Sequence, residues 1–354
     1  MLDQSQIREL VSAHGAAVNE GRPIRQLIED GELPRLYGCT ILEGKVSDSV
    51  FGEGLVHRNG RPIRLMFRNN RISTHDVNRG AIPFKDQVLG VNHQHMLDLV
   101  KEVLGSSQFE VDRLAATSTV IPAENLTLVM LENVIRLYMA ESSTSTSLYQ
   151  HWLTAKDEGQ AVMRYAGHDL DVTQLEVNGR LPYLMDTPST KDKVDRTIEA
   201  TELVELGVCT EEQYQAIRNA SLMAFGMVTQ YLASRGMVLV DTKTEHGINS
   251  EGRIVAADEL YTMDSSRFWR LDDQGEIVTR EGKPVSFSKE FARGMVKDQK
   301  GDQFTEEQAN VIAVRYIEGL QHLTGQAFEP DLRPRDQRIV ESVNLILDSL
   351  LWED

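Results

Sequence analysis

The stretch 237–269 limits what this chain can fold into more than any other. It opens with the apolar run 237–240, after which polar side chains stand at every second position, at Asp241, Lys243 and Glu245. Because every second side chain of an extended strand points to the same face, this pattern predicts a strand. One face of that strand would carry an acid, a base and a second acid in a row, beyond an apolar segment that anchors it.

The residues after the strand predict a hairpin. Residues 249–252 are Asn, Ser, Glu and Gly, which favour a turn, and a second apolar run occupies 254–257. If the turn consists of those four residues, Lys243 faces Asp258 across the hairpin and Glu245 lies one diagonal step away. The hairpin is therefore expected to gather several charged side chains on one face.

The residue types of this hairpin favour metal and phosphate chemistry. Carboxylates without histidine or cysteine suit a hard cation such as Mg²⁺, which often shares its oxygen ligands with substrate phosphates. A lysine among them suits a phosphate or carboxylate oxygen, and the hydroxyls and guanidinium within 264–267 suit an anion. The alternative is a solvated antiparallel hairpin with alternating surface charges.

Composition narrows the class of protein. The net charge of −17 argues against a general nucleic-acid binder and against binding to an anionic membrane. The two cysteines, Cys39 and Cys209, form neither a disulfide framework nor a metal-binding spacing. No apolar run approaches the roughly 20 residues of a membrane span, and the first residues lack a signal-peptide pattern. A cytoplasmic enzyme is expected.

The hairpin sequence also resembles one known family. The segments VDTKTEHG at 240–247 and DSSRFW at 264–269 resemble the signature of the SAICAR synthetases, the phosphoribosylaminoimidazole-succinocarboxamide synthases. Weaker similarity lies at 132–136 (ENVIR) and at 187–191 (TPSTK). The resemblance extends over roughly 36–325 and identifies the chain as a divergent member of the family.

The resemblance implies an α+β fold of two lobes with ATP in the cleft between them. It implies a mostly antiparallel ATP-binding lobe over 36–133 and a mixed α/β substrate and metal lobe over 134–354. Residues 1–35 precede the resemblance and read as a helical N-terminal extension. The sequence supports mixed α/β structure independently, because residues 210–235 read as an amphipathic helix with a capping box between Thr210 and Gln213.

The activity implied by the resemblance is an ATP-dependent ligation in purine biosynthesis. Members of the family join L-aspartate to carboxyaminoimidazole ribonucleotide through an acyl phosphate, giving SAICAR, ADP and phosphate. ATP and Mg²⁺ are the expected cofactors, and the aminoimidazole ribonucleotide and L-aspartate are the expected partners, without nucleic acid or membrane. A homo-oligomer stays open.

The resemblance also implies roles for individual side chains. Lys243 is expected to be the catalytic cation at the transferring phosphate, with Asp241 orienting it or the amine. Glu245 and Asp258 are expected to hold the metal. ATP is assigned to Lys45, Glu132 and Lys243. The substrates are assigned to Arg136, Ser142, Lys191, Asp264, Ser266, Arg267, Lys289 and Arg293.

The chain departs from the family pattern at three positions in expected ligand loops. Ser47 replaces a basic residue, Glu141 replaces a glycine of a phosphate-binding Gly-Ser pair, and Val194 replaces a histidine. A glutamate beside a phosphate would repel it unless its side chain turned away. Two alternatives therefore stay open: a ligase with a different amine or acceptor, and a non-catalytic nucleotide-binding relative. The role of residues 1–35 also stays open.

Overall fold

The computed structural model describes residues 1–44, 47–74, 77–191, 196–296 and 303–351. The chain forms two compact units, each assembled from separated segments. The first unit comprises 1–95, 107–126 and 291–354, and the second comprises 96–106 and 127–290. Each lobe expected from the sequence was one continuous stretch of chain, whereas each of these units combines segments that are separated in the sequence. The expected division of ATP binding from substrate binding stays a prediction.

An antiparallel sheet forms the centre of the first unit. Its strand order is β1-β2-β3-β6, and a separate hairpin pairs β4 with β5. Along β3, Ile63, Leu65 and Phe67 are buried while the residues between them are partly exposed, as the period of two requires. The strands are β1 (Thr40–Glu43), β2 (Ser47–Val56), β3 (Pro62–Arg68), β4 (Arg71–Thr74), β5 (Val77–Ala81) and β6 (Val120–Glu124).

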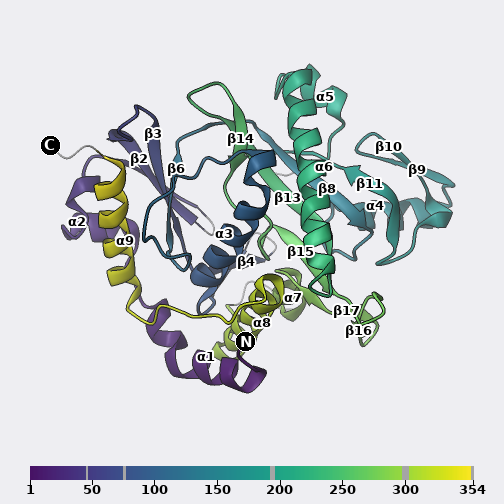
Figure 1. Ribbon diagram of the computed structural model, residues 1–354. Coiled ribbons are helices and arrows are strands. Elements are labelled where there is room, and N and C mark those ends of the chain that lie inside the picture. Colours follow the sequence, from purple (N-terminus) through teal and green to yellow (C-terminus); the bar gives the residue numbers. More distant parts are fainter. Residues whose placement is uncertain (45–46, 75–76, 192–195, 297–302, 352–354) are drawn as a thin grey trace. The chain divides into compact units, whose positions relative to one another are not determined.

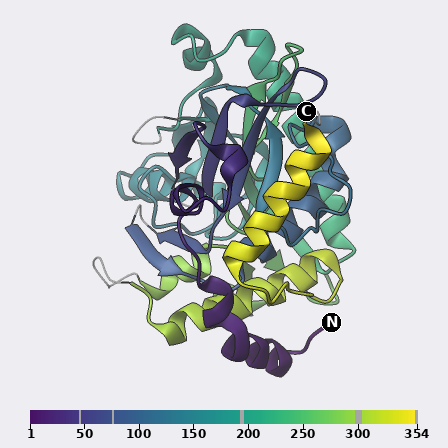
Figure 2. The ribbon, with the colours of Figure 1, turned by 90° about the vertical axis from the view of Figure 1, so that its left-hand side faces the viewer.

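Helices from both ends of the chain complete this unit. Its hydrophobic core joins residues of α2, β2, β3 and α9, and α1 packs along α8, visible in Figure 2 as the dark purple helix beside the yellow-green one. The helices are α1 (Gln4–Asn19), α2 (Ile24–Glu29), η1 (Pro34–Leu36), the first part of α3 (Lys85–Leu104), α7 (Glu290–Met295), α8 (Glu306–Thr324) and α9 (Arg335–Leu350).

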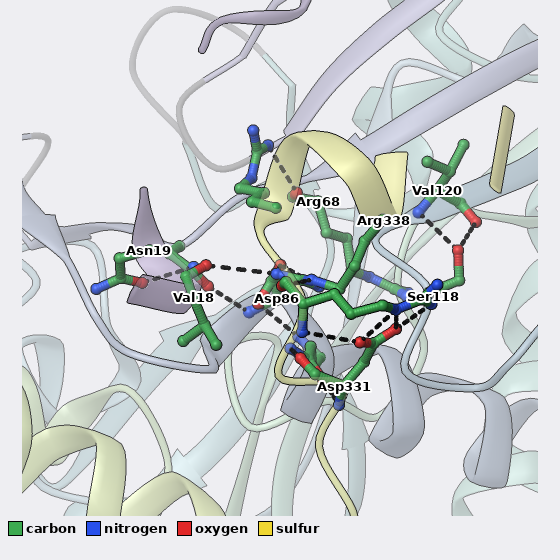
Figure 3. A network of polar contacts seen from close by, with 12 residues as sticks. Val18, Asn19, Arg68, Asp86, Ser118, Val120, Asp331 and Arg338 are labelled. Atoms are coloured by element: carbon green, nitrogen blue, oxygen red, sulfur yellow. Dashed lines mark hydrogen bonds and ion pairs between the residues drawn. The ribbon is translucent and has the colours of Figure 1, made fainter. Parts of the chain in front are cut away.

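A buried ion pair fixes the N-terminal helix within the first unit (Figure 3). Both terminal nitrogens of Arg338 lie 3.3 Å from Asp86 Oδ2, and Nη2 also donates to the Val18 carbonyl at 3.4 Å. The Asn70 amide donates to Asn19 Oδ1 at 2.6 Å and accepts from the Asp86 backbone N–H at 2.8 Å. Residues 1–35 are therefore an integral part of this unit.

A second antiparallel sheet organises the second unit. Its main path runs β11-β8-β13-β15-β18, with β12 paired to β8 and with β7 and β14 paired to β13. β13 is the longest of these strands and joins most of the others (Figure 1). The strands are β7 (Thr127–Leu128), β8 (Leu131–Tyr138), β11 (Arg180–Asp186), β12 (Ser189–Thr190), β13 (Met237–Ile248), β14 (Ile254–Ala257), β15 (Ser266–Arg270) and β18 (Ser286–Phe287).

The helix α6 (Glu211–Ala233) packs across β8 and β13 (Figure 1). Its predicted capping box is confirmed, with Thr210 and Gln213 each accepting from the backbone N–H of the other. Gly236, at φ +63°, takes the left-handed conformation shortly after the helix ends. The apolar face of this predicted amphipathic helix is buried and consists of Tyr214, Ile217, Phe225, Val228 and Leu232.

Smaller elements surround this sheet. α4, β9 and β10 build a hydrophobic cluster of their own around Trp152. Among the described residues, no helix is long and apolar enough to cross a membrane. The remaining elements are α4 (Leu148–Asp157), β9 (Val162–Tyr165), β10 (His168–Asp171), η2 (Val172–Gln174), α5 (Ala200–Glu205), β16 (Thr279–Arg280) and β17 (Lys283–Pro284).

Candidate active site

The predicted hairpin is present, but its register differs by one residue from the sequence prediction. Glu245 pairs with Ala257 on β14, so Lys243 does not face Asp258 as expected. The turn is one residue shorter because Asn249 closes it: its backbone N–H donates to the Arg253 carbonyl at 2.9 Å, and its Oδ1 accepts from the Arg253 N–H at 2.8 Å. Asp258 follows β14 directly, with φ +58°.

The strand β8 pairs with the charged part of β13, and its side chains alternate between the two faces of the sheet. Asp241 pairs with Arg136 and Lys243 with Val134, so these side chains share one face, here called the site face. The buried residues of β8 alternate with them and form the opposite face, here called the helix face. Leu137 of that face lines the same pocket as Phe225 of α6.

On the site face, one carboxylate holds two guanidinium groups, which we call the arginine cluster. Asp241 Oδ2 accepts from Arg136 Nη1 at 2.9 Å, and Oδ1 accepts from Arg267 Nε at 2.8 Å. Arg267 Nη2 also contacts Oδ2. From the sequence, Asp241 was expected to orient Lys243 or the amine, whereas its partners in the structure are the two arginines.

Electrostatics keep the arginine cluster charged. Burial opposes ionisation of Asp241, but the guanidinium groups of Arg267 and Arg136 outweigh it, so the pKa of Asp241 lies below its ordinary value. Burial likewise opposes the charge of Arg267, but Asp241 outweighs it and the pKa of Arg267 is raised. Two guanidiniums and one carboxylate leave the cluster with one net positive charge, which suits an anion.

Two loop segments contact the arginine cluster. Arg267 Nη1 donates to the Glu141 carbonyl at 3.2 Å, which places the adjacent Ser142 near the cluster. Arg136 Nε donates to Thr187 Oγ1 at 3.0 Å. The Glu141 carboxylate, which the sequence analysis placed beside a phosphate, instead lies 3.6 Å from Lys283 Nζ. Its negative charge therefore has a partner of its own.

Four further charged side chains form what we call the lysine cluster, which shares β13 with the arginine cluster. Lys243 Nζ donates to Glu132 Oε1 at 2.7 Å and to Glu245 Oε1 at 3.1 Å. Lys191 contacts the other oxygen of Glu245. Two ammonium groups and two carboxylates balance one another here.

Electrostatics show how Lys243 can act. Burial disfavours its ammonium form, but Glu245 and Glu132 outweigh burial, so the pKa of Lys243 is raised. Burial also opposes ionisation of Glu245, but Lys243 and Lys191 outweigh it and lower the pKa of Glu245. At neutral pH, Lys243 is therefore a cation and not a proton acceptor. Such a cation stabilises phosphate or carboxylate oxygens.

Metal binding at this site depends on a small number of carboxylates. Within the described part of the chain, no group of three or more histidine, cysteine, aspartate or glutamate side chains is arranged to hold a metal ion. Two carboxylates, those of Glu132 and Glu245, nonetheless meet at the Lys243 ammonium. Mg²⁺ commonly takes only one or two carboxylates together with substrate phosphates. This pair fits that pattern.

The other predicted site residues lie in varied places. The Ser266 hydroxyl bonds Thr242 Oγ1 at 2.8 Å, and both residues alternate with Asp241 and Arg267, so Ser266 is on the helix face. The Lys289 backbone N–H donates to the Met263 carbonyl at 2.9 Å, which brings Lys289 beside the segment that carries Asp264. Arg293 belongs to the first unit, on α7, and Lys45 and Val194 lie outside the described residues.

Two contacts beside the TPSTK segment were not predicted from the sequence. Thr187 contacts Arg136 directly, and Asp186 binds two side chains of α6. For the role of Thr187 near the site, the TPSTK motif was the only indication in the neighbouring sequence. The partners of Asp186, Tyr214 and Arg218, lie about 30 residues further along the chain on α6, and Tyr214 belongs to its apolar face.

The sequence of this chain is similar to that of one family. Residues 43–310 match the family model described as SAICAR synthetase. The chain is 30% identical over 278 residues to a putative phosphoribosylaminoimidazole-succinocarboxamide synthase 2 of Agrobacterium fabrum, covering 76% of this chain and 84% of that protein. It is 29% identical over 301 residues to the phosphoribosylaminoimidazole-succinocarboxamide synthase of Legionella pneumophila, covering 82% and 90%.

Solved structures show the same fold. The SAICAR synthase from Saccharomyces cerevisiae complexed with SAICAR superposes with a TM-score of 0.67 at 19% identity, covering 88% of this chain and 99% of that one. A type-2 SAICAR synthetase in complex with ADP gives a TM-score of 0.58 at 20% identity, covering 82% and 100%. The predicted α+β fold is confirmed by these similarities.

Proposed function

Because the chain belongs to the SAICAR synthetase family, we propose that it is an ATP-dependent ligase of purine biosynthesis. It joins L-aspartate to carboxyaminoimidazole ribonucleotide and gives SAICAR, ADP and phosphate. The observation that carries this proposal is the pair of charge clusters on one face of one sheet. The arginine cluster suits an anionic substrate group, and the lysine cluster suits phosphoryl transfer.

The arginine cluster supports a role in holding the phosphate of the ribonucleotide. Arg136 and Arg267 lie on β8 and β15, the two strands that flank β13, and share Asp241, so their guanidinium groups are oriented before a ligand arrives. A net positive charge in a largely buried place attracts an anion more strongly than the same charge in water. Ser142 and Asp264, on adjoining segments, are proposed to complete this site.

The lysine cluster supports a role in activating the substrate carboxylate. A carboxylate is a poor electrophile, so ATP first phosphorylates it; the aspartate amine then attacks the carbonyl carbon of the acyl phosphate and expels phosphate. Phosphoryl transfer depends on positioning and on cations near the transferred group. Lys243 supplies such a cation. We propose that Glu132 and Lys45 address ATP, while Lys191, Lys289 and Arg293 supply cations for the substrates.

The cofactor of this reaction is ATP with Mg²⁺, which would neutralise charge on the phosphates. Glu245 and Asp258 are the proposed metal-linked acids; Asp258 directly follows β14, where its backbone leaves the extended conformation at φ +58°. Both oxygens of Glu245 contact lysines. A metal ion would therefore have to displace one of these ammonium groups or share a Glu245 oxygen with it. Ser266 contributes through the β13–β15 pairing, because its hydroxyl bonds Thr242.

The test is ADP release by the purified protein with Mg²⁺, ATP and carboxyaminoimidazole ribonucleotide, with and without L-aspartate. Aspartate-dependent release together with formation of SAICAR is the expected result. Absence of aspartate-dependent release despite tight ATP binding would overturn the choice of aspartate. A screen of other amines and acceptors would then identify the ligation. We also expect a cytoplasmic enzyme with small-molecule partners.

A further inference from the structure

Asp186 is the last residue of β11 and points away from both charge clusters. It pairs with Ile135, whose side chain lies on the helix face of β8. The next residue, Thr187, donates its backbone N–H to the Val134 carbonyl at 2.7 Å and directs its hydroxyl to Arg136 on the site face. The backbone therefore stays alongside β8, while consecutive side chains point to opposite faces, Asp186 to the helix face and Thr187 to the site face.

Two side chains of α6 hold the Asp186 carboxylate, and we call these three residues the Asp186 anchor. Oδ2 accepts from the Tyr214 hydroxyl at 2.6 Å and from Arg218 Nε at 2.9 Å. Asp186 is 6% exposed and Tyr214 is 1% exposed, so water does not compete strongly for these bonds. His168, on β10, lies 2.8 Å from the Asp186 carbonyl through Nε2.

Electrostatics favour the ionised Asp186 carboxylate and the protonated Tyr214 hydroxyl of the anchor. Burial opposes ionisation of Asp186, but Tyr214 and Arg218 outweigh it, so the pKa of Asp186 lies below its ordinary value. Burial and the Asp186 carboxylate both raise the pKa of Tyr214, so its hydroxyl stays a donor. Hydrogen bonds to a charged group are stronger than bonds between neutral groups.

The segment 187–191 that follows the anchor supplies contacts to both clusters. Thr187 accepts from Arg136 of the arginine cluster, and Lys191 contacts Glu245 of the lysine cluster. Between them, Pro188 restricts both its own backbone and that of Thr187. Ser189 donates to Glu132 at 3.4 Å. A shift at the start of this segment would therefore reach both clusters.

We propose that the Asp186 anchor is a positioning device that couples α6 to the substrate site through the segment 187–191. None of its residues needs to touch a substrate. The anchor fixes the position of the segment alongside β8, and the segment in turn orients Arg136 and Lys191. The consequence for substrate binding rests on the proposed function, whereas the positioning of the segment does not.

The direct test uses the protein without substrates. Tyr214→Phe keeps the buried ring and removes one hydrogen bond to Asp186. The matched control is Tyr231→Phe on the same helix, where the hydroxyl accepts from Arg235 Nε at 3.3 Å. Hydrogen exchange of the Thr187, Thr190 and Lys191 backbone amides is measured for both variants. We expect about tenfold faster exchange in Tyr214→Phe only, because a bond to a charged group is lost.

The second test asks whether the anchor acts through Thr187. Tyr214→Phe is expected to raise the KM for the ribonucleotide about tenfold with little change in kcat, because Arg136 contributes to binding. Thr187→Val removes the hydroxyl that orients Arg136 and should have a similar effect. The double variant should then resemble either single variant, because both changes interrupt the same chain of contacts.

The outcomes separate the anchor from the proposed function. Unchanged amide exchange in Tyr214→Phe, or equal changes in both tyrosine variants, would overturn the anchor. Independent effects that multiply to about a hundredfold in KM would overturn its action through Thr187. If the unaltered protein shows no aspartate-dependent ADP release, the proposed function fails, while the exchange experiment still decides whether the anchor positions the segment.

Discussion

Replacing Asp241 by asparagine should destabilise the protein strongly, because Asp241 is the shared partner of two arginines. The side chains of Arg136 and Arg267 are each 15% exposed, and that of Asp241 is 8% exposed. Removing one partner of a buried ion pair typically costs about 3–5 kcal/mol of unfolding free energy. Since both guanidiniums keep some contact with water, we expect a loss of about 3 kcal/mol, at the lower end of that range.

The same substitution should change how the protein responds to anions. In Asp241→Asn, two guanidiniums remain side by side without a carboxylate, so the arginine cluster carries one more positive charge than before. A ligand that binds only the folded state raises stability as its concentration increases. Inorganic phosphate should therefore recover part of the lost stability in the variant and have a smaller effect on the unaltered protein.

Thermal and denaturant unfolding with increasing phosphate provide the assay. The matched control is Asp98→Asn, which removes a carboxylate 3.1 Å from Lys101 in an exposed pair on α3. Such a pair contributes about 0.2–1 kcal/mol at most. If Asp241→Asn were no less stable than Asp98→Asn, or if phosphate stabilised both variants equally, the assignment of Asp241 as the shared counter-ion would be wrong.

Further predictions concern both units. Lys243→Met should lower kcat for ADP release by roughly a hundredfold or more, because a cation at the transferring phosphate is lost; initial rates with saturating substrates measure this, and an unchanged kcat would contradict it. Glu245→Gln should weaken Mg²⁺ binding in the presence of ATP, as measured by calorimetry, and unchanged binding would remove Glu245 from the metal site. Arg338→Met should cost about 3–5 kcal/mol of unfolding free energy, since it leaves the buried Asp86 carboxylate without its guanidinium; a loss below about 1 kcal/mol in denaturant unfolding would contradict this. Burial lowers the pKa of His246 to about 4, so only the unfolded state takes up a proton as the pH falls below about 6.5, and stability is lost in that direction. His246→Leu should therefore reduce the stability difference between pH 7 and pH 5 by about 2 kcal/mol, and an unchanged difference would show that His246 is not buried in its neutral form.

Local signals in the sequence were sufficient for the helix α6. Its capping box between Thr210 and Gln213 depends on residues only three positions apart, and it is present in the structure. The predicted register of the central hairpin was wrong for an equally local reason. The Asn249 side chain closes the turn, and one residue fewer in the turn changes every cross-strand pair.

Long-range pairing was the part that the sequence did not specify. Asp241 was correctly predicted to share one strand face with Lys243, but its partners depend on the registers of β8 and β15. Ser266 precedes Arg267, yet alternation sends its side chain to the opposite face. The motif that contains both residues identified them as candidates for the site, but it did not show to which face of the sheet each side chain points.

The strand β13 fixes the distance between the arginine cluster, proposed to bind the substrate anion, and the lysine cluster, proposed to act in phosphoryl transfer. Asp241 and Lys243 are two positions apart, so about 6.5–7 Å of backbone separates the arginine cluster from the lysine cluster. Neighbouring strands on both sides bond to this part of β13, which restricts its movement. A loop would have let the two clusters drift apart. Because a strand carries both, a substrate anion held by the arginines keeps a constant distance from the cation proposed to stabilise phosphoryl transfer.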